Sequence, residues 1–215
     1  MFPKRLTEGY RTFLNGRFAS ERARYQELAG SGQSPTIMVI GCVDSRVSPE
    51  VIFDAAPGEI LVARNVANLV PAYDPPTAPE QDISHQHGTS AALEFAVRAL
   101  KVSDIVVLGH AFCGGIKAFA SDAAPLSSSD FIGRWMRQIA PAADAIGPRD
   151  GEGEEGWLRK LEFASVELSL KNLMTFPFVK QAVDAGQLTL HGAYFGVASG
   201  RLLVRNTLTG AFEPV

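Results

Sequence analysis

The chain contains only two cysteines, and each lies in a segment whose residue types suit metal binding. Asp44 and Arg46 follow Cys42 at two-residue intervals, and His110 precedes Cys113 by three positions. Thiolates and imidazole together are ligands that zinc prefers. Three protein ligands would leave the fourth position of a tetrahedral ion open to water. That arrangement is typical of a catalytic zinc site rather than a closed structural one.

The carboxylate and guanidinium that follow the first cysteine indicate a second chemical role. In an extended segment, Asp44 and Arg46 project to the same side because they are two residues apart. A carboxylate held by an arginine stays ionised and oriented. Asp44 could then accept a hydrogen bond from zinc-bound water or bind zinc itself. Cys113 is placed before a helix that opens at Gly114, where free N–H groups favour an anion.

Each pattern taken singly also has an ordinary structural explanation. A cysteine in an apolar strand is usually part of the core. An Asp–Arg pair is more often a structural ion pair, and His-x-x-Cys alone is a weak pattern. The combination in one chain, with no third cysteine, favours a shared site. The other histidines carry less weight, because His191 lies in a predicted strand and His85 and His87 lie in a polar loop.

Short apolar runs that alternate with helical patterns predict an α/β fold, with a central and mainly parallel sheet flanked by helices. Strands are predicted at 36–41, 60–63, 104–109, 188–194 and 202–204. Helices are predicted at 88–100, 131–146 and 157–174, and another begins at 114. A last helix, which follows an interruption at 176–179, ends at 185. Two of these strands end directly before Cys42 and His110. Parallel strands bring their carboxyl ends to one edge of the sheet, where such folds bind ligands.

Residues 1–30 are predicted to form an N-terminal helical arm on a single domain that spans residues 1–215. Leu6, Tyr10, Phe13 and Leu14 recur at helical spacing and form one apolar stripe. Such a stripe needs a covering surface, which either the rest of the domain or a second subunit would supply.

The composition excludes several classes of protein. The 215 residues are 46% hydrophobic and 20% charged, with a net charge of −3, as expected of a globular protein. This charge is too small to favour a nucleic-acid partner. No run of about 18 apolar residues predicts a membrane span, and the N-terminal segment lacks the apolar core of a signal peptide. We therefore expect a cytoplasmic location by default, and in a cytosolic enzyme two cysteines suit ligands or nucleophiles better than a disulfide.

These motifs resemble those of the β-class carbonic anhydrases. The two signatures are Cys42-x-Asp44-x-Arg46 and His110-x-x-Cys113-Gly114-Gly115. The similarity extends over roughly residues 30–205 and includes the segments 64–70, 88–96, 172–179 and 190–194. The resemblance implies one zinc ion per chain, bound by Cys42, His110 and Cys113. Asp44 and Arg46 would act as an orienting pair.

The resemblance also implies positions that contact the substrate. Gln33 matches a glutamine that hydrogen-bonds substrate or product across a dimer interface, and Val66 and Gly114 match residues that line the pocket. Leu61 and Phe95 stand where plant-like members have phenylalanine and tyrosine, so both keep the pocket apolar.

A further position distinguishes two subgroups of that family. Val39 stands where a regulatory subgroup has tryptophan, which implies the plant-like subtype with an open zinc site. Gln33 lies nine positions before Cys42, a distance of about 30 Å if the chain between them is extended. Gln33 would therefore reach a partner's zinc rather than its own, and we expect a homodimer or dimer-based oligomer.

The predicted activity is reversible hydration of carbon dioxide to bicarbonate and a proton. Three different functions stay open beside it. The same fold could hydrolyse carbonyl sulfide or carbon disulfide. Cys113 and His110 could form a cysteine-nucleophile hydrolase. The chain could also be a zinc-binding module without catalysis.

Overall fold

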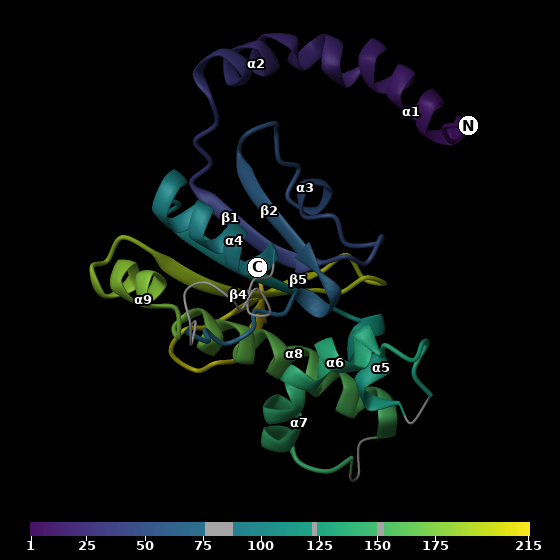
Figure 1. The fold of residues 1–215 in the computed structure, drawn as a ribbon, viewed down its shortest axis with the longest axis vertical. Helices are drawn as coiled ribbons and strands as arrows, with labels where there is room; N and C mark the ends of the chain where they lie inside the picture. Colours follow the sequence, from purple (N-terminus) through teal and green to yellow (C-terminus); the bar gives the residue numbers. More distant parts are fainter. Residues whose placement is uncertain (76–87, 122–123, 150–152) are drawn as a thin grey trace.

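The computed structural model describes residues 1–75, 88–121, 124–149 and 153–215. Within these ranges, six strands form one sheet in the order β2-β1-β3-β4-β5-β6 (Figure 1). The strands are β1 (Ile37–Cys42), β2 (Ile60–Asn65), β3 (Asp104–His110), β4 (Thr189–Phe195), β5 (Leu202–Arg205) and β6 (Phe212–Pro214). The strands β1 to β4 pair in parallel, whereas β5 pairs antiparallel with both β4 and β6. The predicted fold class is confirmed, although β6 was not predicted.

Helices flank the sheet and extend beyond both of its ends. They are α1 (Lys4–Asn15), α2 (Arg17–Ser31), α3 (Pro49–Ile52), α4 (Gly88–Glu94), α5 (Gly114–Ala120), α6 (Phe131–Met136), α7 (Ala140–Ile146), α8 (Gly153–Leu173) and α9 (Pro177–Asp184). A wider π-helical turn over Phe95–Leu100 continues α4. Within the described residues, no helix is both long enough and apolar enough to cross a membrane.

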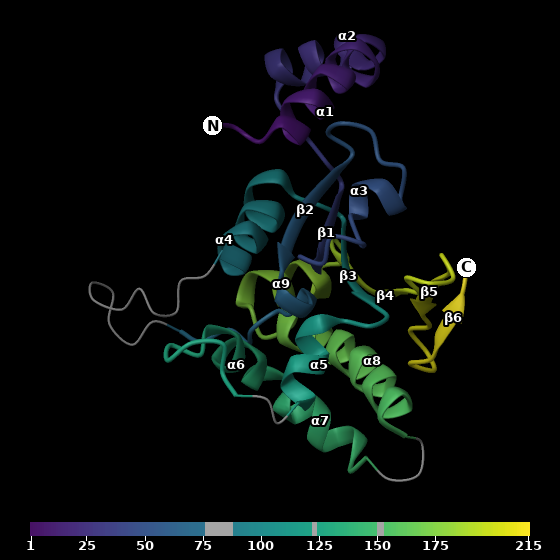
Figure 2. The same ribbon diagram turned by 90° about the vertical axis from the view of Figure 1, so that its right-hand side faces the viewer.

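One face of the sheet packs against α4, α8 and α9. Met38 and Ile40 point into this core from β1 and are fully buried, as are Leu93 from α4 and Val166 from α8. Val39, between the two, faces the other side of the sheet, where α3 lies (Figure 2). Burial on both faces explains why β1 is a continuous apolar run rather than an alternating one.

A second core cluster forms at the carboxyl edge of the parallel strands, among α5, α6, α7 and α8. It contains both cysteines, together with Ile116 from α5, Met136 from α6 and Leu161 from α8. Each of these five side chains is at most 4% exposed. The cysteines therefore lie in a buried, largely apolar setting, where electrostatic interactions are strengthened.

The arm formed by α1 and α2 projects from the end of the sheet opposite α5, α6 and α7 (Figures 1 and 2). Phe13, Phe18 and Tyr25 form an aromatic cluster within it. Leu6 and Tyr10, at 56% and 59% exposed, remain open to solvent. Within the described residues, the domain thus covers only part of the predicted stripe.

Several helices differ from their predicted bounds. The N-terminal helix breaks at Gly16. The helix predicted over 131–146 is divided by a 3-10 turn, and Pro141 lies in the first turn of α7. Proline lacks the N–H that would continue a helix, so it starts a new one. For the same reason α9 begins at Pro177, inside the predicted interruption. α8 begins at Gly153, earlier than predicted.

The helical segment 88–100 buries some of its apolar residues and exposes others. Ala96 is fully buried, whereas Phe95 is 47% exposed and Ala99 is exposed. A π-helical turn bonds i to i+5, so it changes the angle between successive side chains.

Candidate metal centre

The structure brings Cys42, His110 and Cys113 together at the carboxyl edge of the sheet. Cys42 is the last residue of β1, His110 is the last of β3, and Cys113 immediately precedes α5. One ligand atom from each lies within 4.8 Å of the other two. All three residues are at least 96% buried. The parallel pairing of β1 with β3 therefore brings together residues that are far apart in the sequence.

The hydrogen bonding of His110 leaves one ring nitrogen for a ligand. Nδ1 lies 2.9 Å from the carbonyl oxygen of Ala111. A carbonyl only accepts, so Nδ1 carries the proton and Nε2 presents its lone pair. Nε2 is buried and has no hydrogen-bond partner among the described residues. A buried nitrogen of this kind needs an explanation, and a metal ion would satisfy it.

The two thiols change each other's acidity. A hydrogen bond from Cys113 lowers the pKa of Cys42. The same bond, together with burial, raises the pKa of Cys113. Burial lowers the pKa of His110, but interactions with the Cys42 sulfur, the Ala111 carbonyl and Asp44 together more than offset that, so its pKa is raised. A divalent cation between the sulfurs would favour the loss of both thiol protons. The donor set and its burial thus fit zinc.

Asp44 and Arg46 form a bidentate ion pair beside the cluster. Arg46 Nε lies 2.9 Å from Oδ1 of Asp44, and Nη2 lies 2.7 Å from Oδ2. The backbone N–H of Arg46 also donates to Oδ1. Hydrogen bonds from Arg46 hold the pKa of Asp44 well below its usual range, although burial opposes this. Asp44 is therefore an ionised acceptor in a fixed orientation.

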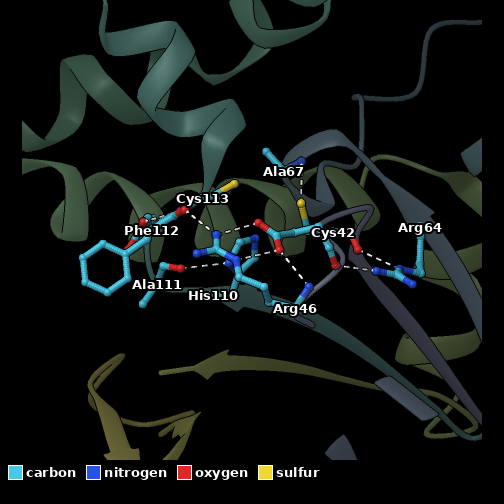
Figure 3. Close-up of polar contacts among 10 residues, drawn as sticks. Cys42, Arg46, Arg64, Ala67, His110, Ala111, Phe112 and Cys113 are labelled. Carbon is cyan, nitrogen blue, oxygen red and sulfur yellow. Dashed lines mark hydrogen bonds and ion pairs between the residues drawn. The ribbon is translucent and has the colours of Figure 1, made fainter. Parts of the chain in front are cut away.

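Arg64 supports the same segment from β2, and sequence reasoning missed this role. Its Nε lies 2.7 Å from the carbonyl oxygen of Cys42, and its Nη2 lies 2.6 Å from that of Asp44 (Figure 3). Arg64 occurs in one of the segments that carry the family resemblance. That segment contained the available signal, but the pattern does not say which backbone groups an arginine will bind.

The loop after β2 directs a backbone donor at the Cys42 sulfur. The N–H of Ala67 lies 3.4 Å from Sγ (Figure 3). Ala67 and Asn68 have φ values of 63° and 49°, in the left-handed region that non-glycine residues rarely adopt. Strain of this kind persists only where surrounding contacts impose it.

Those contacts come from several elements. The side-chain amide of Asn65 bonds both the N–H and the carbonyl oxygen of Leu69 at 2.8 Å. The indole N–H of Trp135, from α6, donates to the carbonyl oxygen of Val66 at 2.8 Å. The loop is therefore fixed from both β2 and α6, and so is the direction of the N–H that points at sulfur.

A cavity of about 580 Å³ lies beside this loop. Its mainly apolar wall includes Val62, Arg64, Asn65, Val66, Thr89 and Trp135. The cavity is open to solvent, and Cys42, Asp44, His110 and Cys113 are not among its lining residues.

Five residues were predicted to contact the substrate, and they do not all lie at this cavity. Among the described residues, Val66 is the one of the five that lines the cavity. Gln33 is exposed in the segment between α2 and β1, and Leu61 packs against the main core. Phe95 is exposed, as is Gly114 at the start of α5. Their contacts with a substrate stay predictions.

Of the other three histidines, the structure describes only His191, which is not part of the cluster. Nε2 of His191 lies 2.7 Å from Oδ1 of Asp104, and the His191 side chain is 36% exposed. His85 and His87 lie outside the described residues. A residue that does contact the cluster, and that sequence reasoning missed, is Glu162 of α8. Its carboxylate accepts a hydrogen bond from the N–H of Cys113.

Known proteins share both the sequence and the fold. The carbonic anhydrase family model matches residues 37–202. The chain is 34% identical over 201 residues to β-carbonic anhydrase 3 of Arabidopsis thaliana, covering 92% of this chain and 74% of the plant protein. The structure of the β-carbonic anhydrase CcaA matches with a TM-score of 0.84 and 28% identity, covering 99% of this chain and 91% of that one. One of the structures from a study of two tetrameric β-carbonic anhydrases of Sordaria macrospora matches with a TM-score of 0.71 and 30% identity, covering 96% and 98%.

Proposed function

This chain belongs to the β-carbonic anhydrases, and from that premise we propose that it is a zinc enzyme that reversibly hydrates carbon dioxide to bicarbonate and a proton. The observation that carries the proposal is the buried convergence of two thiols and an imidazole beside an ion-paired carboxylate. Cys42 and Cys113 would bind the ion through Sγ, and His110 would bind it through Nε2. When bound there, zinc would lower the pKa of a water ligand from about 15.7 towards about 7.

The protein's own groups would orient the reactants. Both Asp44 oxygens accept hydrogen bonds from Arg46, and the carboxylate keeps a further lone pair. Asp44 can therefore also accept a hydrogen bond from the attacking water and so orient that water. The apolar surface around Val66 would hold carbon dioxide and keep bulk water from one side of it. Because Asp44 is engaged by Arg46, it is not free to act as a fourth ligand. This supports the open-site subtype that Val39 implied.

One sample can test the activity. We expect about one zinc per chain, together with carbon dioxide hydration in a stopped-flow assay. A chelator that removes the metal should remove the activity, and added zinc should restore it. A cysteine-nucleophile hydrolase would instead keep its activity without metal and lose it to alkylation.

A zinc module without catalysis and a hydrolase of carbon dioxide analogues would each give a different result on that same sample. The module would bind the metal and show no turnover. An enzyme specific for carbonyl sulfide or carbon disulfide would hydrolyse those substrates and leave carbon dioxide unhydrated. Zinc-loaded protein that does not hydrate carbon dioxide would therefore contradict the proposed function.

The functional unit that we propose is a homodimer or a dimer-based oligomer, in the cytoplasm. The exposed Leu6 and Tyr10 on α1 support an interface with a second copy. Gln33 lies before the amino end of β1, whereas Cys42 lies at its carboxyl end. Gln33 would therefore act in the partner's site. The tetrameric relatives from Sordaria macrospora are consistent with an oligomer.

Mixing two impaired variants tests whether Gln33 acts across the interface. Gln33→Ala and Asp44→Asn should each lower activity without removing zinc. In a mixed dimer, one site would then carry both defects and the other would be intact, so activity should partly return. The measurement is hydration rate before and after subunit exchange, with each variant incubated alone as the control. A mixture that exchanges subunits yet recovers no activity would mean that Gln33 does not act in the partner's site.

A further inference from the structure

A buried carboxylate lies next to the metal centre, and none of the steps proposed above uses it. Glu162 of α8 is 5% exposed. Its Oε1 accepts a hydrogen bond from the N–H of Cys113 at 3.0 Å. Its Oε2 accepts one from the hydroxyl of Tyr194, in β4, at 2.6 Å. Burying a carboxylate is unfavourable unless its hydrogen bonds compensate, so the place of this one calls for an explanation.

The turn between β3 and α5 is the part of the site that needs support. Phe112 has a φ of 58°, which is strained for a non-glycine residue, and it directly precedes Cys113. Cys113 itself is extended, with φ −65° and ψ 119°, before the chain enters α5. Any rotation of this turn would move Sγ of Cys113 away from Cys42 and His110.

One peptide group in this turn is held at both ends. The carbonyl of Phe112 and the N–H of Cys113 belong to the same planar unit, in which they point in opposite directions. Arg46 Nη2 donates to that carbonyl at 3.1 Å (Figure 3). Glu162 accepts from that N–H on the other side. A plane held by the Arg46 guanidinium at its oxygen and by the Glu162 carboxyl group at its nitrogen cannot easily rotate.

We propose that Glu162 is a positioning residue for Cys113. Its carboxylate fixes the Phe112–Cys113 peptide plane opposite Arg46, and Tyr194 fixes the carboxylate. This sets the direction of the Cys113 side chain before any metal arrives. The inference rests on the proposed ligand set where it concerns zinc affinity, but the geometry of the turn does not depend on zinc.

Conservative and disruptive substitutions separate position from charge. A glutamine at position 162 can still accept from the Cys113 N–H through Oε1, and its amide can donate to the Tyr194 oxygen. Glu162→Gln therefore keeps both contacts and removes the charge, whereas Glu162→Ala removes both contacts. Tyr194→Phe leaves the carboxylate but frees one of its oxygens. Val166→Ala, four residues later in α8 and packed in the main core, controls for general loss of stability.

The first experiment measures zinc affinity by chelator competition and the absorption spectrum of the cobalt-substituted protein. We expect Glu162→Ala to weaken zinc binding by about 10–100-fold and Glu162→Gln by less than about threefold, as for groups that orient metal ligands. Tyr194→Phe should fall between them, and Val166→Ala should bind like the parent. The sulfur-to-cobalt bands should change in the alanine variant alone. Parental affinity in Glu162→Ala, or equal losses in the alanine and glutamine variants, would overturn the proposal.

The second experiment needs no metal and so separates this inference from the proposed function. In metal-free protein, mass spectrometry would follow alkylation of Cys113 relative to Cys42. Glu162→Ala should raise this ratio, because the released turn exposes the Cys113 sulfur, while Glu162→Gln and Val166→Ala should match the parent. An unchanged ratio in Glu162→Ala would overturn the positioning role. If the parent protein binds no zinc but the variants still differ from it in alkylation ratio as expected, only the proposed function is contradicted.

Discussion

His110→Ala is expected to remove most of the zinc and to lower carbon dioxide hydration by on the order of 10³-fold or more. Without zinc, the site no longer lowers the pKa of the water that attacks carbon dioxide. His110 contributes the imidazole of the cluster, and its Nε2 is oriented by the Nδ1 contact with Ala111. Metal analysis of the purified variant and stopped-flow hydration are the two measurements.

His191→Ala is the matched control for this prediction. His191 lies in β4 of the same sheet and pairs with Asp104 rather than with the cysteines. Its variant should keep about one zinc per chain. If His110→Ala also retained a full complement of zinc and parental activity, the assignment of His110 as a ligand would be wrong.

Asp44→Asn is expected to keep zinc and to lose about 10–100-fold in hydration rate. The amide has nearly the size of the carboxylate, but it can turn a donor towards the water and cannot form the charged pair with Arg46. Since the pKa of Asp44 is depressed, the parent carboxylate is already ionised at every pH above its ordinary range. The loss should therefore persist across neutral and alkaline pH.

The pH–rate profile and the metal content of the same sample check this expectation. Glu50→Gln removes an exposed carboxylate from α3, a few residues further along the chain, and should leave both quantities at the parental level. A variant at position 44 that hydrates carbon dioxide at the parental rate would mean that Asp44 does not orient the water. Loss of zinc in that variant would instead indicate that Asp44 supports the metal itself.

The sequence predicts the sheet and the meeting of the three ligands because both depend on strong, local patterns. β1 and β3 are short β-branched runs, and their last residues are Cys42 and His110. Parallel strands align their carboxyl ends, so strand assignment alone brings these two residues together. The Asp44–Arg46 pair was also predicted, but from an extended segment. In the structure Ser45 and Arg46 lie in a turn, and the Arg46 N–H donates to the Asp44 carboxylate.

The supporting shell cannot be read from the sequence in this way. Glu162 lies in a long helix whose pattern predicts only core or interface, and its contact with Cys113 depends on how α8 packs against β3. The use of Arg64 and Trp135 as donors to backbone carbonyls also depends on tertiary packing. Phe95 is exposed and lies in a π-helical turn. A prediction that assumes 3.6 residues per turn cannot locate such a turn or the side-chain directions within it.

The parallel pairing of β1 with β3 has a consequence for the kinetics of folding. His110 and Cys113 are close in the chain, but Cys42 joins them only after two distant segments have paired across the sheet. The complete binding site therefore exists only once this long-range pairing is in place. A ligand that binds only the native state stabilises it without stabilising the transition state. Zinc would then protect this protein mainly by slowing its unfolding, while the rate at which the chain folds would remain set by its topology.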